Sequence, residues 1–512
     1  MPATETAEPE VRTAAGLVRG RLEDGLAVFR GIPYAAPPLG EARFQAPRPV
    51  PGWDGVRDAF AFGPPAPQET QYAGRSGGDA FKNTGDEWLT VNVWTPAPDP
   101  AARRPVMVWI HGGAYQLGFS GSPGYDARHI ARDGDVVFVS LNYRLGVEGF
   151  ARLDGAPANR GLLDQVAALH WVRENIAAFG GDPGQVTILG DSAGAGSIAA
   201  LMVMPAARGL FRRAVGQSVP GTFLSDALAR DVAAAIAAQE GLRPTARDLS
   251  AVDPWALPKA GTALQAKMRE HADRWGSFAH TLTPFSPVVD GDVLPAGPWQ
   301  GLAAGAGRDV ELIVGHNRDE WRTFMAFGNL FGKVAEEQAA AALRHFGPGE
   351  NGEHAYREAF PDASAEDLFE LVQTDWLFRM PTLHLAQAQA AGGGAAYLYE
   401  LTWQSPGNGG LMRACHGLDG PLLFGTYDAH LGPLAIGPDH TAEAQPLTTQ
   451  IRTAWTAFAA TGDPGWPAYD TGKHLTRIFD TTPSVAAYPE EASRRLWQDH
   501  AFRAMPLLAT DL

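Results

Sequence analysis

Residues 185–204 read QVTILGDSAGAGSIAALMVM and combine an apolar run, a glycine-flanked turn and an Ala-rich segment. The apolar run at 185–189 predicts a buried strand, and the Ala-rich residues from 194 onward predict a helix. The turn between them, GDSAG at 190–194, matches the pattern G-x-S-x-G, in which a sharp turn exposes a serine. Larger side chains at either glycine would collide with the strand or helix packed beside the turn. Ser192 is therefore predicted to be a nucleophile at a helix N-terminus, where developing negative charge is favoured.

A second motif overlaps this turn. GAGSIA at 194–199 fits G-x-G-x-x-A, the dinucleotide-binding fingerprint, which requires an acidic residue about 20 residues later. That region reads GQSVPG at 216–221, and the next acidic residue is Asp226. Because the serine already accounts for the glycines, we reject a dinucleotide site here and expect no cofactor.

Strands and helices alternate along the rest of the chain, which predicts an α/β protein with a mainly parallel sheet. No clean linker interrupts the pattern, so residues 1–512 are expected to form one domain. The predicted elements are a hairpin at 16–34 with its turn at 23–25, a long surface loop at 63–88, strands at 105–110, 135–141, 212–216, 309–314 (ended by Gly315) and 395–403, helices at 164–179 and 226–240 (capped by Gly241), and a mostly helical region at 335–390.

Composition restricts the function classes. The chain has 512 residues, 45% of them apolar, so it can bury a large core. Its formal net charge of −16 disfavours contact with phosphate backbones, so we expect no nucleic-acid partner. Cys415 is the only cysteine, so no disulfide can form within the chain, which is typical of a reducing compartment.

The N-terminus and the apolar runs bear on localisation. The first 13 residues, MPATETAEPEVRT, have neither the basic region nor the apolar region of a secretory signal. No apolar run approaches the ~18–20 residues that a membrane-spanning helix needs. We therefore expect no membrane span and a cytoplasmic protein.

The sequence HGGAY at 111–115 follows the predicted strand 105–110. It resembles the HGGG-type loop that supplies backbone N–H groups to an oxyanion, and small residues let that backbone approach a carbonyl closely. Together with the N–H of Ala193, such donors would stabilise a tetrahedral intermediate. His111 itself is predicted to hold the loop by hydrogen bonds.

Two downstream segments could supply the acid and the base of a triad in the order Ser…Asp/Glu…His. GHNRDE at 315–320 and CHGLD at 415–419 both follow predicted strands. Open α/β sheets place active sites beyond the carboxyl ends of their strands. The candidates are then His416 for the base, with His316 and His354 as rivals, and Asp319 or Glu320 for the acid. No H-E-x-x-H motif or paired Cys/His spacing occurs, so we expect no catalytic metal.

With these residues in place, the chain resembles the type-B carboxylesterases, which include cholinesterases, bacterial p-nitrobenzyl esterases and bacterial phenylcarbamate hydrolases. The resemblance extends over nearly the whole chain. Its landmarks are FRGIPYAAPPLGEARF (29–44), EWLTVNVWTP (87–96), HGGAY (111–115), NYRLGVEGF (142–150), NRGLLDQVAALHWVRENIAAFGGDP (159–183), VTILGDSAGAGS (186–197), GHNRDE (315–320), CHGLDGPLLFG (415–425) and FAATGDP (458–464).

The resemblance implies an α/β-hydrolase fold, with a mixed, mostly parallel central sheet and helical excursions at 222–300 and 321–394 that form a substrate gorge. It implies hydrolysis of carboxylic esters through an acyl-serine intermediate, with a small-molecule ester as the partner. The family pattern assigns the nucleophile to Ser192, the acid to Glu320, the base to His416, the oxyanion donors to Gly113, Ala114 and Ala193 with Gly112 shaping the turn, and substrate contacts to Tyr115, Thr323 and Phe324.

The resemblance also implies two buried ion pairs, Arg43 with Asp86 and Arg144 with Asp164, and leaves Asp319 facing solvent or Arg318. The chain departs from the family at three places. Trp88 stands where secreted members have a disulfide cysteine, and Trp321 stands where glycine follows the acid. The family's QSGS reads QSVP at 217–220, so a second serine that often supports the acid is expected to be missing.

Two alternatives stay open in the sequence. The same site could hydrolyse a carbamate or an amide. The family also contains adhesion or scaffold members that have lost the serine, although Ser192, Glu320 and His416 are all intact here.

Overall fold

The computed structural model describes residues 8–69 and 84–509. Within them, eleven strands form the main sheet in the order β16-β15-β14-β13-β10-β9-β7-β8-β6-β4-β3. Neighbouring strands from β8 across to β15 are parallel, and those at both edges are antiparallel. The predicted mixed, mostly parallel sheet is confirmed. Its strands are β3 (Arg21–Glu23), β4 (Leu26–Pro33), β6 (Thr90–Thr95), β7 (Arg104–Ile110), β8 (Val137–Leu141), β9 (Gly181–Asp191), β10 (Arg213–Gln217), β13 (Glu311–Asn317), β14 (Ala396–Leu401), β15 (Leu475–Phe479) and β16 (Ser484–Ala487).

Two small sheets and a set of helices complete the fold. The small sheets are β1 (Glu10–Arg12), β2 (Leu17–Arg19) and β5 (Val56–Asp58), and β11 (Leu224–Ser225) with β12 (Val288–Val289). The helices are α2 (Arg128–Asp133), α3 (Gly146–Phe150), α4 (Arg160–Asn175), α5 (Ala193–Leu201), α6 (Asp226–Gln239), α7 (Ala246–Leu249), α8 (Pro258–Gln265), α9 (Ala272–Trp275), α10 (Pro298–Ala303), α11 (Arg322–Phe327), α12 (Glu336–Phe346), α13 (Gly352–Ala359), α14 (Ala365–Thr374), the π-helical turn η9 (Asp375–Arg379), α15 (Met380–Ala391), α16 (Asp419–Phe424), α17 (Gly432–Ala435), α18 (Thr441–Thr461) and α19 (Glu491–Trp497).

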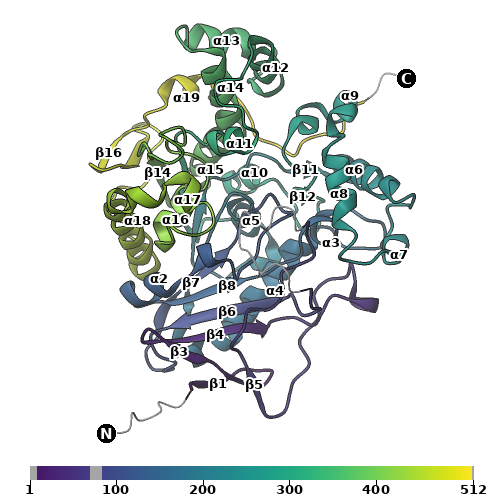
Figure 1. Cartoon of the computed structure of the whole chain (residues 1–512), viewed down its shortest axis with the longest axis vertical. Coiled ribbons are helices and arrows are strands. Elements are labelled where there is room, and N and C mark those ends of the chain that lie inside the picture. Colours follow the sequence, from purple (N-terminus) through teal and green to yellow (C-terminus); the bar gives the residue numbers. More distant parts are fainter. Residues whose placement is uncertain (1–7, 70–83, 510–512) are drawn as a thin grey trace.

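The main sheet is buried on both faces, which explains the unbroken apolar run of β7. Val108 and Ile110 point into one core cluster with residues of α4 and α5, whereas Met107 and Trp109 point into a second cluster with residues of α16 and α18. Alternate residues of a strand face opposite sides of its sheet, so a strand covered on both sides needs apolar residues throughout. In Figure 1, helices α12, α13 and α14 lie at the end of the molecule opposite strands β1 and β5.

Two predictions about local structure are corrected. The loop predicted at 63–88 is not wholly on the surface, because residues 64–68 are buried; residues 70–83 lie outside the described part of the chain. Gly315 does not end its strand, since β13 continues to Asn317. A Cβ atom at Gly315 would lie 2.2 Å from the ring of Tyr399, so this glycine makes room for a neighbouring side chain and does not break the strand.

The predicted excursions contain most of the helices, but α15 in the second of them packs against β13 and β14 of the main sheet. Residues 222–300 include α6 to α9 and the start of α10, and residues 321–394 include α11 to α15. The second excursion contains a core cluster of its own, between α12, α13 and α14. Among the helices of the described residues, none combines the length and the apolar character that crossing a membrane requires.

Candidate active site

Ser192 lies between the end of β9 and the start of α5. Its backbone has φ +52° and ψ −121°, a conformation that a non-glycine residue adopts only when its surroundings impose it. The Ser192 N–H donates to the carbonyl of Gln217 at 2.9 Å. Cβ atoms at Gly190 and Gly194 would lie 2.4 and 2.1 Å from the carbonyl oxygen of Ile110. The collision expected from the sequence is therefore with β7, and it explains why both flanking positions are glycine.

The loop that follows β7 lies directly beside this turn. The N–H of Gly112 donates to Oδ1 of Asp191 at 3.0 Å. Gly113, Ala114 and Tyr115 all have positive φ, at +113°, +55° and +59°, so the chain reverses over three consecutive residues. A Cβ atom at Gly113 would lie 2.2 Å from the carbonyl oxygen of Leu117, which excludes any larger residue there. Asp191, the residue before Ser192, thus binds the loop through its carboxylate.

His111 has the structural role expected of it. It is buried, its ring stacks on Tyr143 with 4.5 Å between centroids, and its Nδ1 lies 2.8 Å from the carbonyl oxygen of Gly112. Burial lowers the pKa of His111 to about 4, so the ring is neutral at physiological pH. A neutral, stacked imidazole holds the loop without adding charge beside Ser192.

His416 and Glu320 form a direct pair. Nδ1 of His416 lies 2.6 Å from Oε2 of Glu320, and the backbone N–H of His416 donates to the backbone carbonyl of Glu320 at 3.1 Å. Glu320 is fully buried. A proton on Nδ1 that is donated to this carboxylate leaves Nε2 of His416 as a proton acceptor. The arrangement can therefore hold an imidazole in the tautomer that a general base needs.

The second oxygen of Glu320 is also held. Oε1 accepts hydrogen bonds from Oγ of Ser218 at 2.5 Å and from the N–H of Asn317 at 2.8 Å. The family's second serine is missing, as expected, and Glu320 is supported without it. Ser218, the serine retained in QSVP, gives this support, and the family's second serine, where this chain has Pro220, is not needed for it.

Three carboxylates determine the basicity of His416. Burial lowers the pKa of His416, but the charge and hydrogen bond of Glu320, with the charges of Asp191 and Asp419, outweigh burial and raise that pKa above its ordinary value of 6.5. Asp191 also responds to its surroundings, because burial and the charge of Asp419 raise its pKa to about 6. Asp191 and Asp419 are not among the site residues predicted from the sequence, although Asp191 directly precedes Ser192 and Asp419 lies three residues after His416.

Asp319 contacts Arg318, one of the two surroundings expected for it, and does not face solvent. Its side chain is buried, Oδ2 accepts from the N–H of Ala414 at 3.2 Å, and the same oxygen lies 3.4 Å from Nε of Arg318. The contact with Arg318 was expected; burial was not. The backbone of the 411–415 segment needs an acceptor at this point, and Asp319 provides it.

The rival histidines have other surroundings. His316 is fully buried, with Nε2 3.0 Å from the hydroxyl of Tyr488 and Nδ1 3.9 Å from Oε1 of Glu400. Burial lowers the pKa of His316 to about 3. His354 is exposed on α13 beside Glu358. Within the described residues, no group of three or more His, Cys, Asp or Glu side chains is placed to hold a metal ion.

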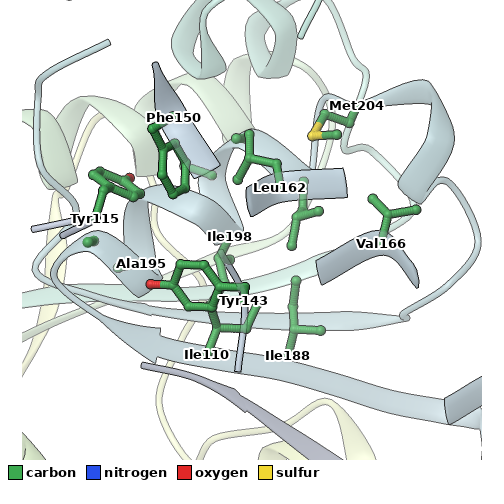
Figure 2. Packing of buried hydrophobic residues seen from close by; sticks show 14 of the residues in the cluster. Ile110, Tyr115, Tyr143, Phe150, Leu162, Val166, Ile188, Ala195, Ile198 and Met204 are labelled. Carbon is green, nitrogen blue, oxygen red and sulfur yellow. The ribbon is translucent and has the colours of Figure 1, made fainter. Parts of the chain in front are cut away.

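The three expected substrate contacts differ in position. Phe324 is partly buried, and its ring centroid lies 5.2 Å from that of His416. Thr323 is buried, and its Oγ1 donates to the carbonyl of His416 at 2.8 Å, so its hydroxyl holds the backbone of His416. Tyr115 is only 2% exposed and packs on Phe150 in the core, as Figure 2 shows. The positive φ values of the loop turn this side chain inward.

One aromatic residue beside His416 was missed. The Phe378 ring stacks on the His416 imidazole, with 4.2 Å between centroids and 27° between planes. Phe378 lies inside the long region predicted as helical, where a single phenylalanine resembles any core residue. No local pattern distinguishes it, because the contact joins residues that are far apart in the chain.

Of the two expected ion pairs, one is confirmed. Nη2 of Arg144 lies 2.7 Å from Oδ1 of Asp164, and both side chains are fully buried. Arg43 pairs instead with Glu148, at 2.6 Å, and Asp86 is exposed. The landmark NYRLGVEGF contains Glu148, which was not considered as a partner. Arg43 also donates to the carbonyls of Ser250 and Val252.

Comparisons with known proteins show which family the chain resembles over nearly its whole length. A family model described as the carboxylesterase family matches residues 7–497. The chain is 36% identical over 495 residues to a para-nitrobenzyl esterase of Bacillus subtilis (strain 168), covering 95% of this chain and 97% of that one. It is 37% identical over 473 residues to a phenmedipham hydrolase of Pseudarthrobacter oxydans, covering 90% and 93%. The crystal structure of a Geobacillus stearothermophilus carboxylesterase at pH 6.2 superposes with a TM-score of 0.83 and 35% identity, covering 96% and 100%.

Proposed function

Because this chain belongs to the carboxylesterase family and is a type-B carboxylic-ester hydrolase, we propose that Ser192, His416 and Glu320 are its catalytic triad. The observation that carries the proposal is the 2.6 Å contact between Nδ1 of His416 and a fully buried Glu320. A buried carboxylate that binds one face of an imidazole fixes its tautomer and stabilises the imidazolium.

The reaction then follows in two acyl transfers. His416 takes the hydroxyl proton of Ser192 through Nε2 as Oγ attacks the ester carbonyl, and returns it to the leaving alcohol. The N–H groups of Gly113, Ala114 and Ala193 bind the oxyanion, with Gly112 shaping the loop. Water, activated by the same imidazole, then cleaves the acyl-serine and releases the acid.

The proposed base predicts the pH dependence. Neutral His416 is the active form, and its pKa is raised above 6.5, so kcat/KM should fall as pH drops through a value above 6.5. In Glu320→Gln, the charge of Glu320 is lost while His416 stays buried, so the pKa of His416 should fall. The residual hydrolysis should therefore persist to lower pH. The measurement is kcat/KM between pH 5 and pH 9 on a neutral ester. An acid limb below 6.5 in the wild type would exclude His416 in this environment as the base.

A second substrate class is supported by the phenmedipham hydrolase relative, and we propose carbamate hydrolysis at the same serine. The nitrogen lone pair makes a carbamate carbonyl less electrophilic than an ester carbonyl. We therefore expect a p-nitrophenyl ester to show the higher kcat/KM, a matched phenylcarbamate to be cleaved more slowly, and a matched anilide to be the poorest substrate. Ser192→Ala should abolish all of these activities together. If this variant still cleaves carbamates, carbamate hydrolysis takes place at another site.

We propose further that the protein works in the cytoplasm as a single catalytic domain. Cys415, the only cysteine, is buried and cannot form a disulfide within the chain, which suits a reducing compartment. The main sheet takes its strands from β3 near the N-terminus to β16 near the C-terminus, which supports one domain.

A further inference from the structure

Helices α14 and α15 are joined by the π-helical turn η9, in which the N–H of Met380 donates to the carbonyl of Asp375. Pro381 has no N–H to donate to the carbonyl of Leu377, four residues earlier, so a regular helical hydrogen bond cannot form there. The Leu377 carbonyl instead accepts from the N–H of Gly221 at 2.8 Å. Single π-helical turns within α-helices occur frequently at functional sites.

This turn is bonded to the segments that carry Glu320 and Ser218. Arg379 forms a buried ion pair with Asp375 at 2.6 Å and also donates to the carbonyl of Arg318, two residues before the proposed acid. Just before the turn, Oγ1 of Thr374 accepts from the N–H of Trp321 at 3.0 Å, one residue after the acid. Gly221, bound to Leu377, lies three residues after Ser218. These bonds thus attach the turn to the backbone before and after Glu320.

From this rigid turn, Phe378 reaches the base. Its side chain is 2% exposed, and its ring stacks on His416 at 4.2 Å. Phe324 contacts the same imidazole less closely, at 5.2 Å, and lies nearly parallel to Phe378, at 7°. The face of an aromatic ring carries partial negative charge and attracts a cation placed over it. A protonated imidazole is the cation that forms beside Phe378 in each acyl transfer.

We infer that Phe378 is a positioning residue for ester hydrolysis: its ring fixes the plane of the His416 imidazole and stabilises the imidazolium, and the π-helical turn holds the ring in place. The inference rests on the proposed role of His416 as general base. Phe378 acts through His416 and is not assigned a contact with the substrate.

The test is Phe378→Leu, which keeps an apolar side chain and removes the ring. The charged groups that face His416 are Glu320, Asp191 and Asp419, and all three stay in this variant. We expect kcat to fall about tenfold, because a small misplacement of a catalytic group is costly, while KM stays within about twofold. The acid limb of kcat/KM should move to lower pH by about half a unit, the size expected from loss of a cation–π contact. Phe378→Tyr, which keeps the ring, should restore kcat and the limb.

Phe369→Leu is the matched control. Phe369 lies on α14, is partly buried and packs against the same small cluster as Phe378, so the variant makes the same chemical change in the same part of the core. It should lower the melting temperature without moving kcat or the acid limb. Equal losses in both variants would show that Phe378 matters only for packing. A raised KM with unchanged kcat and limb would make it a substrate contact, and either result overturns the inference.

His416→Gln separates this inference from the proposed function. If His416→Gln keeps activity, His416 is not the base and the proposed function fails. If His416→Gln is inactive while Phe378→Leu behaves as wild type, the proposed function stands and only the inference about Phe378 is overturned.

Discussion

Replacing Ser192 by alanine is expected to lower kcat by about 10⁶-fold, the loss seen when a serine hydrolase loses its nucleophile. The change removes only Oγ. The strained backbone at φ +52° and the glycines on either side can stay as they are, because their packing against the Ile110 carbonyl does not involve the hydroxyl. The measurement is steady-state hydrolysis of a p-nitrophenyl ester by purified variant and wild type.

Two controls make this result interpretable. Melting temperature and circular dichroism should match the wild type, since alanine tolerates the turn at least as well as serine. Ser197→Ala, a buried serine on α5 whose Oγ accepts from Gln165 at 3.1 Å, changes the same residue type close by and should leave kcat nearly intact. A Ser192→Ala enzyme that kept a tenth of wild-type kcat would contradict the assignment of the nucleophile.

The second large effect is expected for Glu320→Gln. The amide can donate to Nδ1 of His416, which favours the tautomer that has its proton on Nε2 and cannot act as a base. In a serine protease, the equivalent acid-to-amide change costs about 10⁴-fold in kcat. The loss should appear in kcat more than in KM, because Glu320 is fully buried behind the imidazole.

Asp319→Asn is the matched variant, because it makes the same acid-to-amide change one residue earlier. Asparagine keeps an oxygen that can accept from the Ala414 N–H, so the loop should hold its shape. Lost contact with the guanidinium of Arg318 costs at most a modest amount of stability, since exposed pairs are worth ~0–1 kcal/mol and this one is partly exposed. We expect kcat to stay within about tenfold of wild type. If Asp319→Asn is the more damaging variant, Glu320 is not the acid.

The sequence was informative where a local pattern imposes a local geometry. GDSAG could be placed on a strand–turn–helix because the steric demand on both glycines comes from an adjacent strand. The buried strands were found because a sheet covered on both faces needs unbroken apolar runs. Gly315 shows the limit of this reasoning, since its small size makes room for Tyr399 on β14 and carries no signal of strand end.

The remaining features depend on contacts between distant segments. Ser218 reaches Glu320 across 102 positions, and a motif comparison that asks for a second serine misses this bond. Arg43 reaches Glu148 across 105 positions, and its partner could not be chosen among several nearby acids without the fold. Tyr115 is buried because three consecutive positive φ values turn it inward, and single-sequence patterns do not reveal φ.

In the proposed mechanism, one serine, Ser192, is activated by the Glu320–His416 pair. The most direct test is to treat the wild type with a fluorophosphonate, digest it and locate the adduct by tandem mass spectrometry, with Ser192→Ala and Glu320→Gln treated in parallel. We expect one adduct, on Ser192, which is absent from Ser192→Ala and forms far more slowly in Glu320→Gln. An adduct on another serine, or labelling of Glu320→Gln at the wild-type rate, would contradict this activation of Ser192.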